Sequence, residues 1–322
     1  MRKLLRIGTR ESQLAVWQAN QVKNLLAHHD IKSKLVYIKS EGDLDLKTPL
    51  YEMGVQGIFT RSLDTALLND RIDIAVHSMK DVPTQMAQGI AQAAVLKRGN
   101  PKDLLVCKGE RENISGRLSI LKDQSTQPDD SGGPALTIAT SSIRRRAQWL
   151  NRYPGHHLEN LRGNINTRLR KLVQSNWDGA IFAAAGLERM ELRSTNTIEL
   201  EWMLPAPAQG AIVVVCKEGD NNMLEHCHHL HDEQTALCTK IERDFLRTLL
   251  GGCSTPIAAL AEIEEDDLYF RGNILTPDGQ QKAEIEKILP VDKSMNIGNT
   301  AAEEILNNGG EEIIARIRHA KN

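Results

Sequence analysis

A lysine and an aspartate, Lys80 and Asp81, stand side by side directly after a short apolar run. That run, residues 72–76, is typical of a buried strand of a parallel sheet, and Pro83 ends the segment. In open α/β folds the ends of such strands face the ligand crevice. A lysine and an aspartate at that place can bind a charged substrate and transfer protons. Solvated charges at a strand end are the alternative explanation.

A basic window between residues 140 and 171 is the second candidate for chemistry. It holds one acidic residue, Glu159, in a chain of formal net charge −2. Its basic residues are Arg144, Arg145, Arg146, Arg152, Arg162, Arg168, Arg170 and Lys171. Cations in the first turns of a helix oppose its macrodipole, so a bound anion is the natural reason for Arg144 and Arg145. Arginine forks favour a ligand with several carboxylates, and a solvated basic face or an RNA patch are the alternatives.

Two further candidates lie towards the ends of the chain. Arg10 and Ser12 fall between an expected strand and an expected helix, whose N-terminal amides favour a carboxylate or phosphate. A plain capping turn explains them equally well. Cys253 follows two glycines at the end of a helical pattern, where a thiol is open to attachment or to nucleophilic attack. Free cysteines are more often packing residues, and spacing alone favours packing here.

Composition narrows the class of protein. A chain of 322 residues with 40% hydrophobic and 25% charged residues is expected to form two or three globular domains. Aromatic content of 4% disfavours a nucleic-acid surface of stacked rings. No apolar run reaches the roughly 20 residues of a membrane helix, and the N-terminus turns polar too early for a signal peptide. Five scattered cysteines without a CxxC pair fit a reducing cytosol, so a cytoplasmic location is expected.

The order of the expected elements is that of helix-covered parallel sheets. Strands are expected at residues 4–7, 35–38, 72–76, 104–107, 136–139, 178–183 and 212–215. Residues 109–134 are polar and predict an exposed insertion without regular structure. Residues 100–101 and 204–211 are interpreted as two crossings between two lobes, which would enclose a clam-shell cleft. The histidines of residues 226–231 lack the separated pairs of zinc motifs, so a polar helix face is favoured and no metal is expected.

Six motifs, in the correct order, make the chain resemble the porphobilinogen deaminase (hydroxymethylbilane synthase) family almost from end to end. They are residues 8–12, 72–83, 140–145, 161–168, 205–211 and 250–257. The resemblance implies an α/β fold with two domains built like periplasmic binding proteins, joined by hinge strands, and a small C-terminal α+β domain. The implied boundaries are residues 1–99 with 211–229, residues 100–210, and residues 230–322.

The resemblance also implies an activity and a cofactor. Enzymes of this family condense four porphobilinogen molecules head to tail, with loss of ammonia, into the linear tetrapyrrole hydroxymethylbilane. They build it on a covalent dipyrromethane primer, which a thioether to Cys253 would hold here. The resemblance further implies a monomer that binds neither nucleic acid nor membrane, with a transient hand-off of product to uroporphyrinogen-III synthase.

The same resemblance assigns residues to roles. Asp81 matches the catalytic aspartate, which would bond the pyrrole N–H groups, stabilise the azafulvene cation left by ammonia and transfer protons. The implied cofactor-binding residues are Cys253, Lys80, Asp81, Ser12, Thr140, Ser142, Arg144, Arg145, Arg168 and Gly186. The implied substrate-binding residues are Arg10, Ser12, Phe59, Arg162, Arg168, Arg189 and Gln209.

One departure from the family pattern concerns the lid motif Gly-x-Lys-Gly-x-Phe. Gln56 replaces its lysine while Phe59 is kept, so one cationic contact to the substrate is expected to be missing.

Three other functions compete with the enzyme: a non-catalytic clam-shell receptor for a polycarboxylate, a hydrolase that uses Cys253 with His77, and an RNA binder that uses the basic window.

Overall fold

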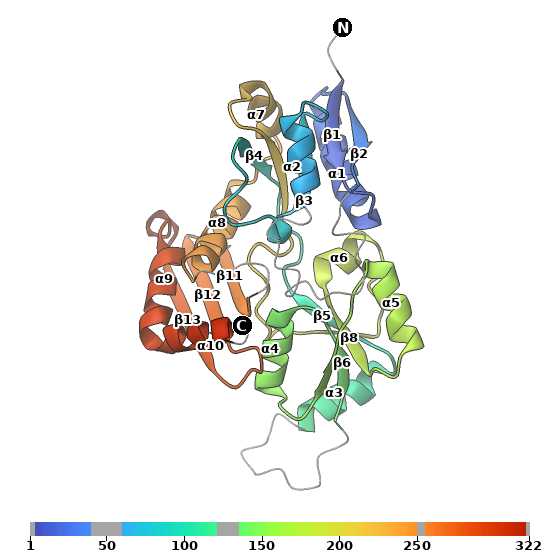
Figure 1. Ribbon diagram of the computed structural model, residues 1–322, viewed down its shortest axis with the longest axis vertical. Helices are drawn as coiled ribbons and strands as arrows, with labels where there is room; N and C mark the ends of the chain where they lie inside the picture. The colour runs from blue at the N-terminus through green and yellow to red at the C-terminus, as the bar shows by residue number, and fades with distance from the viewer. Residues whose placement is uncertain (1–3, 40–59, 121–134, 250–254, 320–322) are drawn as a thin grey trace.

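The computed structural model describes residues 4–39, 60–120, 135–249 and 255–319. Three sheets organise these residues, and Figure 1 shows them as two stacked lobes with a third unit at their side. The strand orders are β2-β1-β3-β10-β4, β7-β6-β8-β5-β9 and β11-β12-β13. The expected class is therefore confirmed: two α/β lobes and a smaller C-terminal α+β unit. Within the described ranges, no helix combines the length and the apolarity needed to cross a membrane.

The first lobe is a mixed sheet with helices on both faces. Its strands are β1 (Leu5–Thr9), β2 (Ser33–Tyr37), β3 (Ile74–Ser78), β4 (Ile90–Val95) and β10 (Ile212–Lys217). Helices α1 (Gln13–His28) and α7 (Asn221–His228) pack with Ile74 and Val76, whereas α2 (Arg61–Leu68) packs with Ala75 on the opposite face. The apolar run predicted near residues 72–76 thus forms the central strand β3. Helices cover both of its faces, and β1 and β10 pair with its two edges.

The second lobe repeats this plan. Its strands are β5 (Asp103–Cys107), β6 (Thr137–Ala139), β7 (His157–Glu159), β8 (Gly179–Ala183) and β9 (Thr197–Glu199), and its helices are α3 (Arg111–Ile120), α4 (Ile143–Arg152), α5 (Ile165–Gln174) and α6 (Ala184–Arg189). Strand β6 pairs in parallel with β7 and β8, whereas β5 runs antiparallel between β8 and β9.

Helix α3 corrects one prediction from the sequence. An insertion without regular structure was expected from residue 109, yet residues 111–120 are helical. Ile114 and Leu118, one turn apart, are buried against Leu136 and Trp149. Two apolar residues at helical spacing suffice to dock this helix, and the polar residues around them concealed the pattern. The rest of the expected insertion, residues 121–134, lies outside the described residues.

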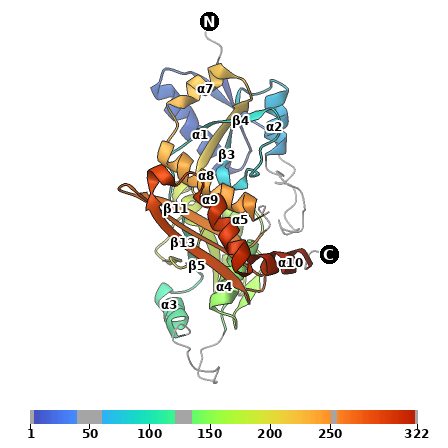
Figure 2. The same cartoon turned by 90° about the vertical axis from the view of Figure 1, so that its left-hand side faces the viewer.

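The C-terminal unit is an antiparallel sheet covered by helices. It comprises β11 (Ile257–Glu264), β12 (Asp267–Leu275), β13 (Lys282–Pro290), α8 (Glu233–Thr248), α9 (Ile297–Ile305) and α10 (Glu311–His319). Ile241 and Phe245 of α8 pack into its core beside Phe270. Figures 1 and 2 both place α8 at the junction between the first lobe and the three-stranded sheet.

Two chain segments cross between the lobes and run side by side. Gly99 N donates to Gly210 O at 3.1 Å, and Leu96 N donates to Ile212 O at 3.0 Å. Gly210 has a φ of +90°, and a Cβ there would lie 2.6 Å from Gly99 O. Glycine is therefore required at this crossing, both for its backbone conformation and for the close approach.

Candidate functional site

A cleft of about 710 Å³ opens between the lobes and the C-terminal unit. Its lining comes from the N-terminal ends of α1, α4 and α5, from the turn after β3, from α6 and from the second crossing. Most residues predicted for the site line it together: Arg10, Ser12, Lys80, Asp81, Ser142, Arg144, Arg145, Arg162, Arg168, Gly186, Arg189 and Gln209. Residues that lie more than a hundred positions apart in the sequence thus share one cavity.

Three predicted site residues are not in this set. Thr140 is buried beside the cleft, where its Oγ1 accepts a hydrogen bond from Ser142 N at 3.2 Å. Phe59 and Cys253 lie outside the described residues, as does Gln56 of the lid motif. Leu246 and Thr255, which precede and follow residues 250–254, both line the cleft.

Helix caps place the basic residues at the cleft. Ser12 caps α1 by accepting from Ala15 N, and Ser142 caps α4 by accepting from Arg145 N, each at 3.4 Å. Asn164 caps α5 by accepting from Thr167 N at 2.9 Å. Each cap fixes where its helix begins. The positive ends of the three helix dipoles therefore lie at the cleft with the arginines, which favours an anionic ligand.

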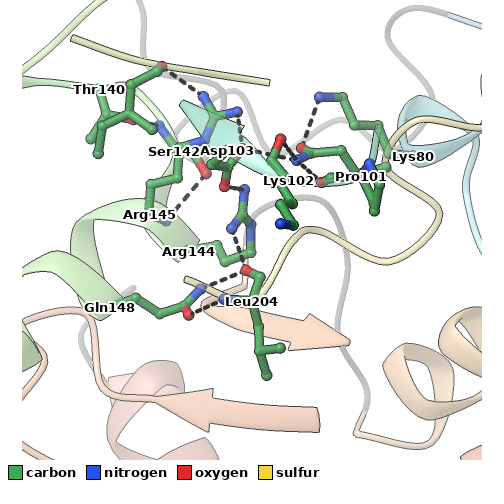
Figure 3. A network of polar contacts seen from close by, with 12 residues as sticks. Lys80, Pro101, Lys102, Asp103, Thr140, Ser142, Arg144, Arg145, Gln148 and Leu204 are labelled. Atoms are coloured by element: carbon green, nitrogen blue, oxygen red, sulfur yellow. Dashed lines mark hydrogen bonds and ion pairs between the residues drawn. The ribbon is translucent and has the colours of Figure 1, made fainter. Parts of the chain in front are cut away.

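A buried carboxylate, Asp103, joins the two neighbouring arginines of α4 (Figure 3). Its Oδ1 accepts hydrogen bonds from Arg145 Nη2 and from Gln209 Nε2, both at 2.8 Å. Its Oδ2 accepts one from Arg144 Nη2, also at 2.8 Å. Burial alone would raise the pKa of Asp103, but the two guanidinium groups hold it well below its usual range. Asp103 is therefore an anion that belongs to the protein itself.

Sequence reasoning missed Asp103. The sequence assigned Arg144 and Arg145 to an external anion, yet one protein carboxylate already pairs with both. Two cations share that single anion, so the cluster keeps a net positive charge. The only signal in the sequence was an aspartate at the start of an otherwise apolar strand, Asp103–Cys107, where a charge is expected to have a partner.

Lys80 and Asp81 stand on a short 3-10 turn, Met79–Asp81, directly after β3. Lys80 Nζ donates to Gln209 Oε1 at 3.2 Å, so Gln209 links this turn to Asp103. Burial lowers the pKa of Lys80 to about 8, although Asp81 opposes that shift.

Two further cationic side chains of the cleft also have lowered pKa values. Burial lowers the pKa of Arg168 to about 10, and the charges of Arg145 and Arg162 act in the same direction. Burial likewise lowers the pKa of Arg189 to about 10. The cleft thus crowds cations in a poorly solvated place, and a ligand with several negative groups would relieve this crowding.

His77 does not belong to this arrangement. It faces a small space beside Thr60 and Asp64 on the other side of β3, and it does not line the cleft. Burial, followed by the charge of Arg10, lowers the pKa of His77 to about 3. An imidazole of such low basicity, placed away from the cleft, is a poor general base for a nucleophile there. Among the described residues, no three His, Cys, Asp or Glu side chains converge so as to hold a metal ion.

Comparison with known proteins finds similarity to one family over nearly the whole chain. The family model "Porphobilinogen deaminase, dipyromethane cofactor binding domain" matches residues 5–225, and "Porphobilinogen deaminase, C-terminal domain" matches residues 236–307. The porphobilinogen deaminase of Syntrophotalea carbinolica is 38% identical over 317 residues, which are 97% of this chain and 96% of that protein. The chloroplastic porphobilinogen deaminase of Pisum sativum is 39% identical over 319 residues, 95% of this chain and 82% of that protein.

Similarity to solved structures is more remote. The periplasmic VFT2 domain of Bordetella pertussis BvgS is 9% identical and overlaps at a TM-score of 0.38, over 70% of this chain and 86% of that chain. This likeness is too low to bear on function.

Replacing Asp103 with asparagine should lower the free energy of unfolding by about 3–5 kcal/mol, because two buried guanidinium groups would lose their counter-charge. Urea unfolding at pH 7 measures the loss. Glu262→Gln, in the exposed Arg271–Glu262 pair, is the control and should cost less than about 1 kcal/mol. The folded pKa of Asp103 lies below the unfolded value of about 3.9, so the stabilisation should disappear as the pH falls below that value. Equal effects of the two variants at pH 7 would contradict this.

Lys80 should lose its proton near pH 8 when the cleft is empty, whereas ordinary lysines titrate near about 10.4. Trace acetylation of the Cys253→Ala chain, followed by peptide mass spectrometry across a pH series, measures this midpoint. Because a bound anion favours the charged form, a saturating polycarboxylate should move the midpoint upwards. Affinity for carboxylates should correspondingly decline above pH 8. A midpoint near 10.4 in the empty cleft would refute the assignment.

Proposed function

We propose how the cleft performs its reaction from one premise: the chain belongs to the porphobilinogen deaminase family. Its activity is that of a porphobilinogen deaminase, and its larger matched domain is the one that binds a dipyrromethane cofactor. The residue roles proposed below rest on a single observation. Asp81 lies in the same cleft as the arginines and the lysine that the sequence had assigned to carboxylate binding.

The substrate explains the excess of cations. Each porphobilinogen ring carries an acetate and a propionate, so every ring added brings further carboxylates into the cleft. We assign the substrate carboxylates to Arg10, Arg162, Arg168 and Arg189, with Ser12 and Gln209 as neutral donors. Arginine forks suit this role because each can hold both oxygens of a carboxylate.

The residues present fit the dipyrromethane cofactor. Its carboxylates would be held by the cationic side chains of Lys80, Arg144, Arg145 and Arg168, with Ser12, Ser142, Thr140 and the backbone at Gly186 as further donors. The Nε atoms of Arg144 and Arg145 are buried and make no hydrogen bond within the described part of the chain. We place the thioether on Cys253, since Leu246 and Thr255 on either side of that segment line the cleft. When bound, the cofactor supplies the primer to which substrate units are added.

We assign two roles to Asp81: it stabilises the positive charge on the substrate and it transfers protons. Departure of ammonia leaves a positive charge on the substrate, and a carboxylate in a poorly hydrated cleft stabilises such a charge strongly. Among the described residues Asp81 forms no salt bridge, whereas Asp103 is fully engaged by two arginines. Asp81 therefore has a carboxylate to offer the substrate. The same carboxylate can hydrogen-bond the pyrrole N–H and receive the proton released when two rings join.

Three expectations from the sequence, on domain boundaries, on assembly and on location, are also proposals. Domain boundaries at residues 1–99 with 211–229, 100–210 and 230–322 are supported by β10, which lies between β3 and β4 of the first sheet. A monomer with a transient hand-off to uroporphyrinogen-III synthase, and a cytoplasmic location, rest on the family resemblance and on cysteine usage.

Intact-protein mass spectrometry tests the cofactor assignment. The purified chain should carry an excess mass equal to two linked pyrrole units, and Cys253→Ala should lack it and be inactive. Cys238→Ala, at a buried cysteine on α8, is the matched control and should keep the adduct. An unmodified yet active chain would reject the cofactor assignment, and an inactive chain without an adduct that still binds polycarboxylates would support the receptor instead.

Replacing Asp81 with alanine should reduce kcat by at least about 100-fold, because one preorganised charge at the reacting centre is lost. Thermal unfolding should be nearly unchanged. Asp70→Asn, whose side chain is 76% exposed and pairs with Lys217, is the control and should keep full turnover. The variant His77→Gln separates this enzyme from a cysteine hydrolase. The enzyme should keep its turnover, whereas the hydrolase would lose its general base and with it its activity. Substantial activity in folded Asp81→Ala would overturn the role of Asp81.

A further inference from the structure

Arg243 connects helix α8 of the C-terminal unit to the turn that carries Asp81. Its Nη1 donates to Val82 O at 2.8 Å and to Met79 O at 3.4 Å. Its Nη2 donates to Pro83 O at 2.6 Å. The carbonyl of Met79 lies directly before the pair Lys80–Asp81, and the other two belong to the two residues that follow it. One guanidinium group therefore fixes the backbone on both sides of the proposed catalytic aspartate.

The part of helix α8 from which the Arg243 side chain extends is itself fixed by hydrogen bonds. The preceding residue, Glu242, is fully buried, and its Oε1 accepts hydrogen bonds from Arg98 Nη1 at 2.6 Å and from Ala261 N at 2.8 Å. Its Oε2 accepts one from Ala208 N at 2.6 Å. Arg98 and Ala208 belong to the two crossings between the lobes, and Ala261 belongs to β11. At this point α8 is thus anchored to three other parts of the molecule, and Arg243 extends from a rigid platform.

The geometry points to Arg243 as a positioning residue for Asp81; this inference rests on the proposed role of Asp81. Arg243 acts through backbone carbonyls and holds Met79–Pro83 at a fixed distance from α8. The same helix ends at Thr248, shortly before Cys253. Arg243 therefore keeps the turn that carries the aspartate in register with helix α8. A planar, five-donor fork is needed, since a single ammonium nitrogen cannot span carbonyls on both sides of the turn.

The first test compares Arg243→Met with the wild-type holoenzyme as the full chain. We expect kcat to fall about 10- to 100-fold, because small displacements of a catalytic group have effects of that size. KM for porphobilinogen should change less than about threefold, since the cations assigned to substrate lie on other elements. Arg247→Met, one turn later on α8 with a 56% exposed side chain paired with Asp244, is the matched control and should keep wild-type kcat. An unchanged kcat in Arg243→Met overturns the inference.

A double-mutant cycle separates positioning from a merely structural role. Asp81→Glu displaces the carboxylate by one methylene, so a residue that acts through Asp81 has little left to contribute. Arg243→Met should then lower kcat by no more than about threefold in the Asp81→Glu background. Additive losses in the cycle would show that Arg243 stabilises the fold without positioning Asp81, and would overturn the inference.

Arg243→Lys provides the measurement if Arg243→Met does not fold or does not carry the cofactor. Its kcat should lie below that of the wild type while the covalent adduct and the melting temperature are retained, and wild-type kcat would overturn the inference. Asp81→Ala separates this inference from the proposed function. If Asp81→Ala keeps turnover, the role of Asp81 fails and the inference with it; if only Arg243 variants keep it, the inference alone fails.

Discussion

The carboxylate of Asp103 is the interaction on which the cleft depends. It is fully buried, and it gathers donors from α4 and from the second crossing around one point at the start of β5. Two guanidinium groups could not remain charged in this place without an anion, because an unpaired buried charge is very costly. A single carboxylate for two arginines leaves a surplus of positive charge. This side of the cleft is therefore preorganised to bind an anion. Gln209 extends the same hydrogen-bond network to Lys80.

The sequence predicts the parts of this site that depend on local pattern. Lys80 and Asp81 were identified because a strand end followed by charges is visible within about ten residues, and the caps at Ser12 and Ser142 are equally local. Asp103 could not be paired with its arginines, since the partner of a buried charge is decided by packing across forty residues of chain. Arg243 has the same difficulty, because an arginine in a charged helix looks like a solvated face until the fold brings the turn beside it.

Helix α8 gives the C-terminal unit a share in the chemistry of the first lobe. Neighbouring residues on this helix, Glu242 and Arg243, contact both crossings and the turn after β3. The walls of the cleft consequently belong to three units that these hydrogen bonds link to one another. A rotation of one lobe against the other would strain the hydrogen bonds that Glu242 accepts from both crossings.

The position of β10 has a consequence for the order in which the molecule forms. Residues 212–217 lie between β3 and β4, so the first sheet is incomplete until they are available. On the ribosome, the lobe that begins the chain must therefore wait for a strand made more than a hundred residues after β4. The second lobe draws its strands from one continuous stretch, residues 103–199, and can pair them as soon as that stretch has emerged. The lobe made first is completed second. Until β10 is available, β3 is paired only with β1 and β4 has no partner in the sheet, so these open edges need protection during synthesis.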